Sequence, residues 1–253
     1  MERKLAENGE RKPVTPGEGE TGAVEAVKTH ASDTELSDDL ALALLKRPDL
    51  ERDALERISK NSGLMKSRKV KLALVEHPKT PRHVLLPLLR HLFTFDLMRV
   101  ALVPTIAADI KVAAEESLIN RLDKLSLGEK LSLARRASGR VAGALLRDSE
   151  PRVIDAALQN SRLTESVVIR ELSRRTTDPQ LINALCIHQK WKVRTDITIA
   201  LLRNDNTPIA NAIELVRLLP AAVARGILEE SHLSEDRKSQ ICDAAATSIK
   251  IPQ

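Results

Sequence analysis

The sequence predicts an all-α protein folded as a right-handed α-solenoid of short stacked helices. Three observations predict this fold. The composition favours helix over strand, a short phrase rich in Ala and Leu recurs along the chain, and the residues after most copies of the phrase are typical of a new helix start. Since each unit is too small to bury its own apolar face, stacked neighbours must cover it.

Composition is the first of these observations. Leu, Ala, Arg, Lys and Glu are abundant among the 253 residues, and these side chains lose little freedom in a helix. The chain has no Tyr, one Trp (Trp191) and two Phe (Phe93 and Phe95), so strand-forming aromatics are scarce. We therefore expect an interior of Leu, Ile, Val and Ala, which suits thin helical layers.

Charge divides the chain into two segments. Residues 1–39 hold 5 Lys and Arg against 10 Asp and Glu, a charge of −5, whereas residues 40–253 hold 35 against 25, a charge of +10. The first segment is predicted to be a disordered acidic N-terminal tail, because it has too few large apolar groups to offset its ordering entropy. Residues 40–253 are predicted to form the α-solenoid repeat domain. The opposite charges suggest a weak fold-back of the tail that would compete with an anionic ligand.

The N-terminal sequence, the longest apolar segment and the cysteines predict a soluble cytoplasmic protein. The chain opens Met1-Glu2-Arg3-Lys4 without a following apolar stretch, which gives no secretory signal, and its longest apolar segment, 83–93, is too short to span a membrane. Cys186 and Cys242 are far apart and give neither a disulfide framework nor a metal cluster. We expect no cofactor.

The recurring phrase locates the helix ends. Its small Ala allows close approach of a neighbouring helix, its Leu pair fills the interior, and a basic, His or Asn side chain near the end suits the negative helix terminus. His77 and His188 occupy equivalent places and are expected to hydrogen-bond the last carbonyls of their helices. The copies are Ala43–Pro48, Ala73–Pro78, Ser132–Ala137, Ala156–Ser161, Ala184–Gln189 and Ala200–Asp205.

Helix starts are predicted at four dipeptides that place an N-cap acceptor before a suitable first-turn residue. They are Thr80-Pro81, Thr164-Glu165, Asp178-Pro179 and Thr207-Pro208. Copies of the phrase at 132, 156 and 184 are 24 and 28 residues apart, which leaves room for two helices of about ten residues and two turns. We expect about seven to nine helical pairs or half-pairs, less regular near 88–122.

Two segments resemble a known family. Residues 151–158, Pro-Arg-Val-Ile-Asp-Ala-Ala-Leu, and Lys192-Val193-Arg194 look like the Pro-x-Val-Arg signature of bacterial HEAT-like repeats, and the Asn-x-x-Thr-Pro turns look like the leucine-rich repeat variant. The resemblance covers about 40–219 and implies an α-solenoid whose relatives mostly bind proteins or nucleic acid. The variant family has an N-terminal iron–sulfur cysteine cluster, but this sequence has no cysteines for one.

Two basic clusters are the candidate binding surface. The planar fork of Arg matches a phosphate or a carboxylate, so a ridge of such groups could hold a phosphodiester backbone or an acidic peptide. Alternatively the first cluster is a solvated face with local pairs to Asp123 and Glu129. The candidate residues are Lys124, Lys130, Arg135, Arg136 and Arg140 in the first cluster, and Lys190, Lys192 and Arg194 in the second.

Trp191 has two interpretations. Its cationic flanks and Asp196 resemble the groove of base-excision enzymes with a HEAT-like fold, where cation–π contacts and a carboxylate support glycosidic-bond cleavage. Such a pocket needs several aromatics, and this sequence has none near Trp191. We therefore favour a packing role for Trp191 at the turn between two helices.

The function expected from the sequence is non-catalytic binding. No phosphate-binding loop, nucleophile elbow or zinc-protease motif is present. The first hypothesis is a scaffold whose groove binds a protein partner through an acidic or amphipathic segment. The second is sequence-independent nucleic-acid binding through the basic ridges, where the scarcity of aromatics argues against binding of single strands by base stacking.

Overall fold

The computed structural model describes residues 36–174, 176–231 and 233–247, and every regular element in these ranges is helical. Fifteen α-helices and two short 3₁₀ helices follow one another without a strand. The described part of the chain is therefore all-α, as its composition predicts. None of its helices is long and apolar enough to cross a membrane. The chain divides into two compact units, 1–88 and 89–253.

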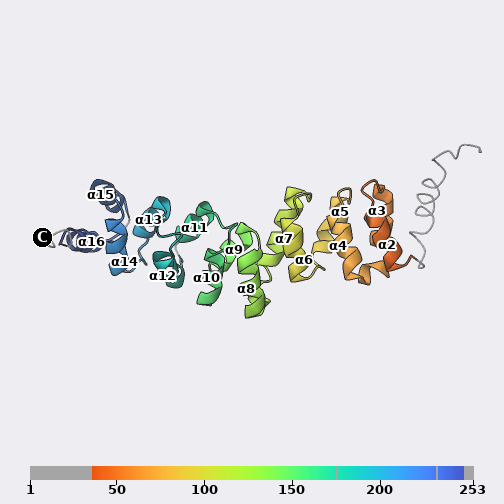
Figure 1. The fold of residues 1–253 in the computed structure, drawn as a ribbon, viewed down its shortest axis with the longest axis horizontal. Coiled ribbons are helices and arrows are strands. Elements are labelled where there is room, and N and C mark those ends of the chain that lie inside the picture. Colours follow the sequence, from red (N-terminus) through yellow and green to blue (C-terminus); the bar gives the residue numbers. More distant parts are fainter. Residues whose placement is uncertain (1–35, 175, 232, 248–253) are drawn as a thin grey trace, which may run out of the picture. The chain divides into compact units, whose positions relative to one another are not determined.

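The described part of the first unit contains four α-helices (Figure 1). They are α2 (Asp38–Leu45), α3 (Arg52–Lys60), α4 (Arg68–Glu76) and α5 (Arg82–Leu89), with the 3₁₀ helix η1 (Leu64–Lys66) before α4. Helix α2 packs against α4. Leu55 and Ile58 on α3 and Leu74 on α4 are completely buried. Leu55 and Ile58 are three residues apart, so they lie on one face of α3, which is the face that the unit buries.

Helix α2 begins at Asp38 and so includes the last two residues of the predicted acidic tail. The Ser37 side chain accepts a hydrogen bond from the Leu40 amide at 3.3 Å, and Asp38 and Asp39 stand in the first turn. Two carboxylates at a helix N-terminus are stabilised by the helix dipole, so Asp38 and Asp39 belong to the helix. The predictions of disorder and of fold-back for the tail concern 1–35, which lie outside the described residues.

The second unit contains eleven α-helices within its described residues. The first seven are α6 (Thr94–Leu102), α7 (Ala108–Ile119), α8 (Leu127–Arg136), α9 (Gly139–Leu145), α10 (Pro151–Leu158), α11 (Glu165–Leu172) and α12 (Pro179–Ile187), with η2 (Leu122–Lys124) before α8. Four more follow: α13 (Thr195–Leu202), α14 (Ile209–Arg217), α15 (Ala221–Glu229) and α16 (Glu235–Thr247).

Helices of this unit pack in two rows. Helices α7, α9, α11, α13 and α15 form one row in which each contacts the next, and α8, α10 and α12 form another. Figure 1 shows α11, α13 and α15 on one side of the unit and α8, α10, α12 and α14 on the other. Helix α14 packs against α16. From α7 to α16, each helix therefore contacts a helix two positions away along the chain.

The recurring Ala-Leu phrase marks helix ends, as predicted. Helices α2, α4, α8, α10, α12 and α13 end inside its six copies. The copy at 200–205 ends α13, whereas the copies at 132, 156 and 184 end α8, α10 and α12 in the other row. The phrase therefore occurs at helix ends in both rows. It does not indicate to which row a helix belongs.

Two of the four predicted N-caps are wrong. The Thr80 hydroxyl donates to the Leu74 carbonyl at 2.7 Å, and the Thr207 hydroxyl donates to the Leu201 carbonyl at 2.6 Å. Both threonines therefore bond the helix behind them, because its free carbonyls lie within reach of the hydroxyl. The N-cap of α14 is Pro208.

The other two predicted starts are N-cap positions. Asp178 accepts from the Gln180 amide at 2.8 Å and so caps α12, with Pro179 as its first residue. Thr164 is the N-cap of α11 but forms no capping hydrogen bond with its side chain. Of the four dipeptides, only Asp178-Pro179 therefore forms the predicted cap in full.

Side chains after the helix ends form hydrogen bonds to carbonyls 23 to 32 residues earlier in the chain. The Asn160 amide group donates to the carbonyls of Ala134 and Ala137, at 2.7 and 3.1 Å, and its oxygen accepts from the Arg162 amide at 2.8 Å. Asn204 repeats this arrangement with the Leu172 carbonyl and the Asn206 amide, each at 2.9 Å. Each link satisfies a carbonyl left open at a helix C-terminus and fixes how two helices stack.

His77 forms the same kind of link, which differs from its predicted role. Its Nδ1 accepts from the Lys79 amide at 3.2 Å, so its Nε2 carries the hydrogen that is donated to the Arg47 carbonyl at 2.9 Å. The imidazole therefore bonds a carbonyl 30 residues earlier and not the last carbonyls of its own helix α4. His188 likewise accepts from the Lys190 amide at 3.2 Å through Nδ1.

Candidate basic binding surface

The five cations of the first predicted cluster differ in their contacts: three are exposed without an ion pair in the described part of the chain, and two form ion pairs. Lys124 in η2 and Arg135 and Arg136 in the last turn of α8 are exposed, and none of the three forms an ion pair within the described residues. Lys130 is different, because its Nζ lies 2.7 Å from the carboxylate of Asp148, whose side chain is largely buried. The five cations therefore do not form one continuous open ridge.

Arg140 is also paired. Its guanidinium lies 2.9 Å from Glu116 and 3.7 Å from Glu115, both on α7, so it links α9 to the preceding helix of the same row. The local partner Glu129 is used elsewhere: it closes a capping box with Ser126 at the start of α8. Hydrogen bonds from the Ser126 hydroxyl and then from its backbone amide lower the pKa of Glu129. In place of local pairs to Asp123 and Glu129, Lys130 pairs with Asp148 after α9 and Arg140 pairs with α7.

The second predicted cluster lies in the turn between α12 and α13. Arg194, the N-cap of α13, is 3.6 Å from Glu165 at the start of α11. The Lys190 ammonium lies 4.3 Å from the centre of the Trp191 ring, a cation–π distance. Lys192 is half-buried. Lys190 and Lys192 form no salt bridge within the described residues, so these cations remain available on an exposed turn.

Trp191 is a packing residue, as favoured by the sequence. It is only 2% exposed, and its indole Nε1 donates to the Leu158 carbonyl at 2.9 Å, at the end of α10. A buried ring whose only donor is already used cannot stack on a flipped nucleobase. Trp191 therefore joins the turn after α12 to the end of α10, in the same way as the asparagine links.

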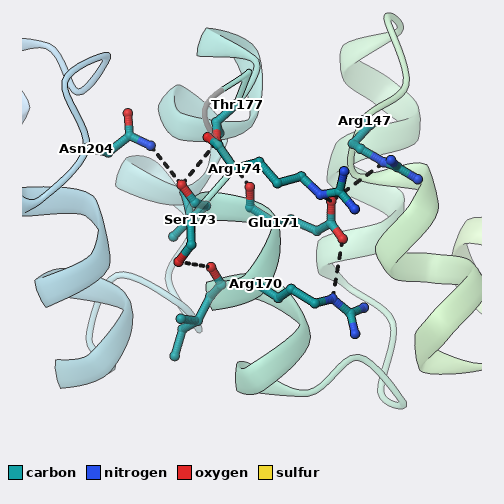
Figure 2. A network of polar contacts seen from close by, with 9 residues as sticks. Arg147, Arg170, Glu171, Ser173, Arg174, Thr177 and Asn204 are labelled. Carbon is teal, nitrogen blue, oxygen red and sulfur yellow. Dashed lines mark hydrogen bonds and ion pairs between the residues drawn. The ribbon is translucent and has the colours of Figure 1, made fainter.

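A third group of cations, the arginine cluster, was not predicted. It consists of Arg147, Arg170 and Arg174 around the carboxylate of Glu171 (Figure 2). The Nε atoms of Arg147 and Arg174 lie 3.6 and 2.8 Å from Oε2 of Glu171, and the Nε of Arg170 lies 3.7 Å from Oε1. Figure 2 shows Arg147 reaching this carboxylate from one neighbouring helix end while Arg170 approaches from the other side.

The Glu171 carboxylate at the centre of the arginine cluster is buried, whereas the three arginine side chains are exposed to solvent. The Glu171 side chain is 4% exposed, and the three arginine side chains are about half exposed. No hydrogen bond of good geometry reaches Oε2 of Glu171 within the described residues. Three cations thus surround one carboxylate, and their guanidinium groups contact no second acceptor in the described part of the chain.

The C-terminal end of α11 holds this cluster in place. The Thr177 hydroxyl lies within hydrogen-bond distance of the carbonyls of Glu171, Leu172 and Arg174, at 3.1, 3.0 and 2.6 Å. Asn204, from the turn after α13, donates to the same Leu172 carbonyl (Figure 2). These bonds occupy the carbonyls that would otherwise be free at the helix end, so the backbone bearing Glu171 and Arg174 is fixed from two sides.

Two hollows adjoin the arginine cluster. The larger, called here the α11–α13 groove, has a volume of about 890 Å³ and is bordered by Arg174 and Arg203. Its wall also includes the apolar side chains Ile169, Leu172 and Ile199. The smaller hollow has a volume of about 430 Å³ and contains Arg147, Lys130 and Asp148. Because Arg147 and Arg174 meet at Glu171, the cluster stands between the two hollows.

A repeat signal in the sequence could have located these arginines. Arg121, Arg147, Arg174 and Arg203 each stand just after the last residue of α7, α9, α11 and α13, the row that holds the cluster. Arg121 donates to the carbonyls of Leu92 and Arg90, and Arg203 pairs with Glu230 after α15. Only the two central arginines, with Arg170, converge on a shared carboxylate.

No family model matches this chain, and no curated protein or solved structure matches it.

Proposed function

We propose that this protein is a non-catalytic binding scaffold, an α-solenoid whose α11–α13 groove holds an extended segment of a protein partner. The contacts between helices two positions apart along the chain, from α7 to α16, support a right-handed solenoid of the HEAT-like kind. In such an architecture every repeat contributes a similar surface, and a groove between two successive helices of one row can accept a peptide.

The observation that carries this proposal is the composition of the groove. Ile169, Leu172 and Ile199 provide apolar wall, and Arg174 and Arg203 provide charge at its border. Burial of apolar side chains favours association, and a few fixed polar groups set the register of the ligand. A peptide with apolar side chains and an anionic group matches both kinds of surface, whereas a phosphodiester backbone would leave the apolar wall unused.

The proposal is tested by blocking the groove. Ala200 lines it, so Ala200→Arg places a long charged side chain where the ligand would lie, and Ala210→Arg at an exposed position of α14 is the matched control. Peptides would be selected from a random display library on the full chain and then measured by fluorescence anisotropy. We expect Ala200→Arg to abolish binding of the selected peptides and Ala210→Arg to leave it unchanged. Selected peptides that bind both variants equally would overturn the proposal.

A second candidate function is duplex nucleic-acid binding through exposed cations. Lys124, Arg135 and Arg136 support it, since they are exposed and form no ion pair within the described residues. The test is retention on duplex DNA and RNA over a salt series with Arg135→Glu/Arg136→Glu. Phosphate contact predicts steep salt dependence and a shallower slope in the double variant. Absence of retention at low salt would exclude this function.

A further inference from the structure

We propose that the arginine cluster binds the phosphate group of a phosphorylated peptide segment lying in the α11–α13 groove. This inference rests on the proposed function and specifies the anchor of the same ligand. The arginines concerned are Arg147, Arg170 and Arg174, held around Glu171.

The charge of the cluster indicates an anionic ligand. Three guanidinium groups and one carboxylate leave an excess of two positive charges. Arg147 and Arg174 both approach Oε2 of Glu171, so two positive charges share one carboxylate oxygen. A phosphate dianion would neutralise the excess, and its oxygens can accept paired N–H groups from guanidinium forks.

The guanidinium groups are oriented for a ligand outside the protein. Each approaches Glu171 most closely through Nε, the inner nitrogen of the guanidinium, and the side chains of Arg147, Arg170 and Arg174 are 47%, 60% and 47% exposed. The two terminal nitrogens lie farther from the main chain than Nε and carry the parallel donors that bind an oxyanion bidentately. Glu171 therefore holds the arginines from the buried side and leaves their open side for a ligand.

The cluster is also preorganised. Thr177 and Asn204 fix the end of α11 through its carbonyls, and the Glu171 ion pair with Arg147 ties α9 to α11. Arginine side chains lose considerable rotamer freedom when they bind an anion, and a fixed carboxylate reduces that loss by restricting them beforehand. The site thus needs little rearrangement to accept phosphate.

The carboxylates in the two hollows favour a single anion over a polyanion. Asp196 and Asp205 line the α11–α13 groove, and Asp123 and Asp148 line the smaller hollow. A nucleic-acid strand carries a charge at every nucleotide, so phosphates on either side of the cluster would meet these carboxylates. One phosphate flanked by apolar or basic side chains avoids that repulsion. A phosphorylated Ser or Thr in a peptide with such neighbours fits this pattern.

Peptide libraries provide the test. The probes are two libraries with random flanks, one with a central phosphoserine and one with a central serine, together with inorganic phosphate and a short DNA duplex. Affinities for the full chain are measured at constant ionic strength. We expect the phosphoserine library to bind at least about tenfold more tightly than the serine library and to enrich apolar and basic flanking residues. Inorganic phosphate should compete with it, and the duplex should bind more weakly.

Variants separate this inference from simple charge attraction. Arg147→Gln and Arg170→Gln should each weaken phosphopeptide binding by about tenfold, whereas Arg135→Gln, an exposed arginine of α8, should leave it within about twofold. Arg147→Lys keeps the charge but loses the fork, so it should also weaken phosphopeptide binding. Circular dichroism checks that the variants are folded.

Three results would overturn the inference. They are equal affinity for the two libraries, an equal loss in Arg135→Gln, and tighter binding of the duplex than of the phosphopeptides. If the serine library binds as tightly as the phosphoserine library and Ala200→Arg abolishes both, the groove still binds peptides and only the phosphate anchor is wrong. If neither library binds, the proposed function fails as well.

Discussion

The side chain of Asn160 donates to the Ala134 carbonyl, 26 residues earlier, across the junction between α10 and α8. It also donates to Ala137 and accepts from the Arg162 amide, so this buried amide group, 1% exposed, is fully hydrogen-bonded. The bond connects two helices of one row at the ends where their carbonyls are open. It therefore combines a helix cap with a constraint on stacking.

Replacing Asn160 tests the contribution of this link. Asn160→Leu keeps a similar volume but leaves two carbonyls and one amide without their partner, which should lower the free energy of unfolding by about 2–4 kcal/mol. Asn183→Leu on the exposed side of α12 is the same substitution without burial and should change stability by less than about 0.5 kcal/mol. Chemical denaturation followed by circular dichroism gives both values. Equal losses in the two variants would refute a specific role for the link.

Trp191 makes a comparable link with a different donor. Trp191→Phe retains much of the buried ring but removes Nε1–H, so the Leu158 carbonyl loses its partner and the free energy of unfolding should fall by about 1–3 kcal/mol. Because Trp191 is the one Trp of the chain, the emission of the wild type reports its burial and should shift to the red on unfolding. An emission maximum that already corresponds to a solvent-exposed indole in the native protein would contradict the buried position.

The two cysteines should differ in reactivity. Burial raises the pKa of the Cys186 thiol, and the charge of Glu214 adds to this effect, while a hydrogen bond with Asn211 opposes it. Cys242 is exposed on α16. Because the thiolate is the reactive form, an aromatic disulfide reagent should label Cys242 rapidly and Cys186 slowly at neutral pH. Cys242→Ser should abolish the fast phase and Cys186→Ser the slow one; the reverse assignment would show that the environment of Cys186 is open.

Close packing of α9 is tested by two glycines. A Cβ atom on Gly139 would lie within van der Waals overlap of the Arg162 carbonyl oxygen, a backbone atom that a side-chain rotation cannot move, whereas a Cβ on Gly226 in α15 would meet no atom within 4 Å. Gly139→Ala should therefore lower the free energy of unfolding by about 1–3 kcal/mol. Gly226→Ala should raise it by about 0.5–1 kcal/mol, because Ala is the better helix former. Thermal unfolding compares the two, and a stabilised Gly139→Ala variant would show that the chain at 162 can move away.

The helix ends were predictable because they depend on local chemistry. The Ala-Leu phrase combines a small residue, an apolar pair and a terminator within six positions, and helix ends lie in all six copies. The roles of Thr80 and Thr207 were not predictable from this pattern, since a hydroxyl between two helices can bond either one. Here the carbonyls of Leu74 and Leu201 behind them are within reach.

The arginine cluster illustrates a different limit. Arg147 and Glu171 are 24 residues apart, and they meet only because α9 and α11 stack with one particular offset. The predicted cations Lys130 and Arg140 found partners in the same way, in Asp148 and Glu116. Residue type and spacing identify which side chains are charged, but the stacking offset decides which of them remain open to a ligand.

His188 provides a prediction about pH. Burial, and then the charge of Lys190, lower the pKa of this imidazole, while Asp155 and a backbone hydrogen bond oppose the shift. Because the folded protein disfavours protonated His188, the neutral imidazole contributes to the stability of the fold. This contribution is fully present above the unfolded-state pKa of about 6.5 and is lost as the pH falls through the lower folded-state pKa.

His188→Asn tests this pH dependence. The variant keeps an acceptor for the Lys190 amide, as Asn160 and Asn204 do in their turns, but cannot titrate. The wild type should therefore lose more stability than His188→Asn between about pH 7.5 and 5, measured by chemical denaturation at each pH. The side chain is partly exposed, so the difference should be small, and its absence or a reversed sign would exclude a native state that prefers neutral His188.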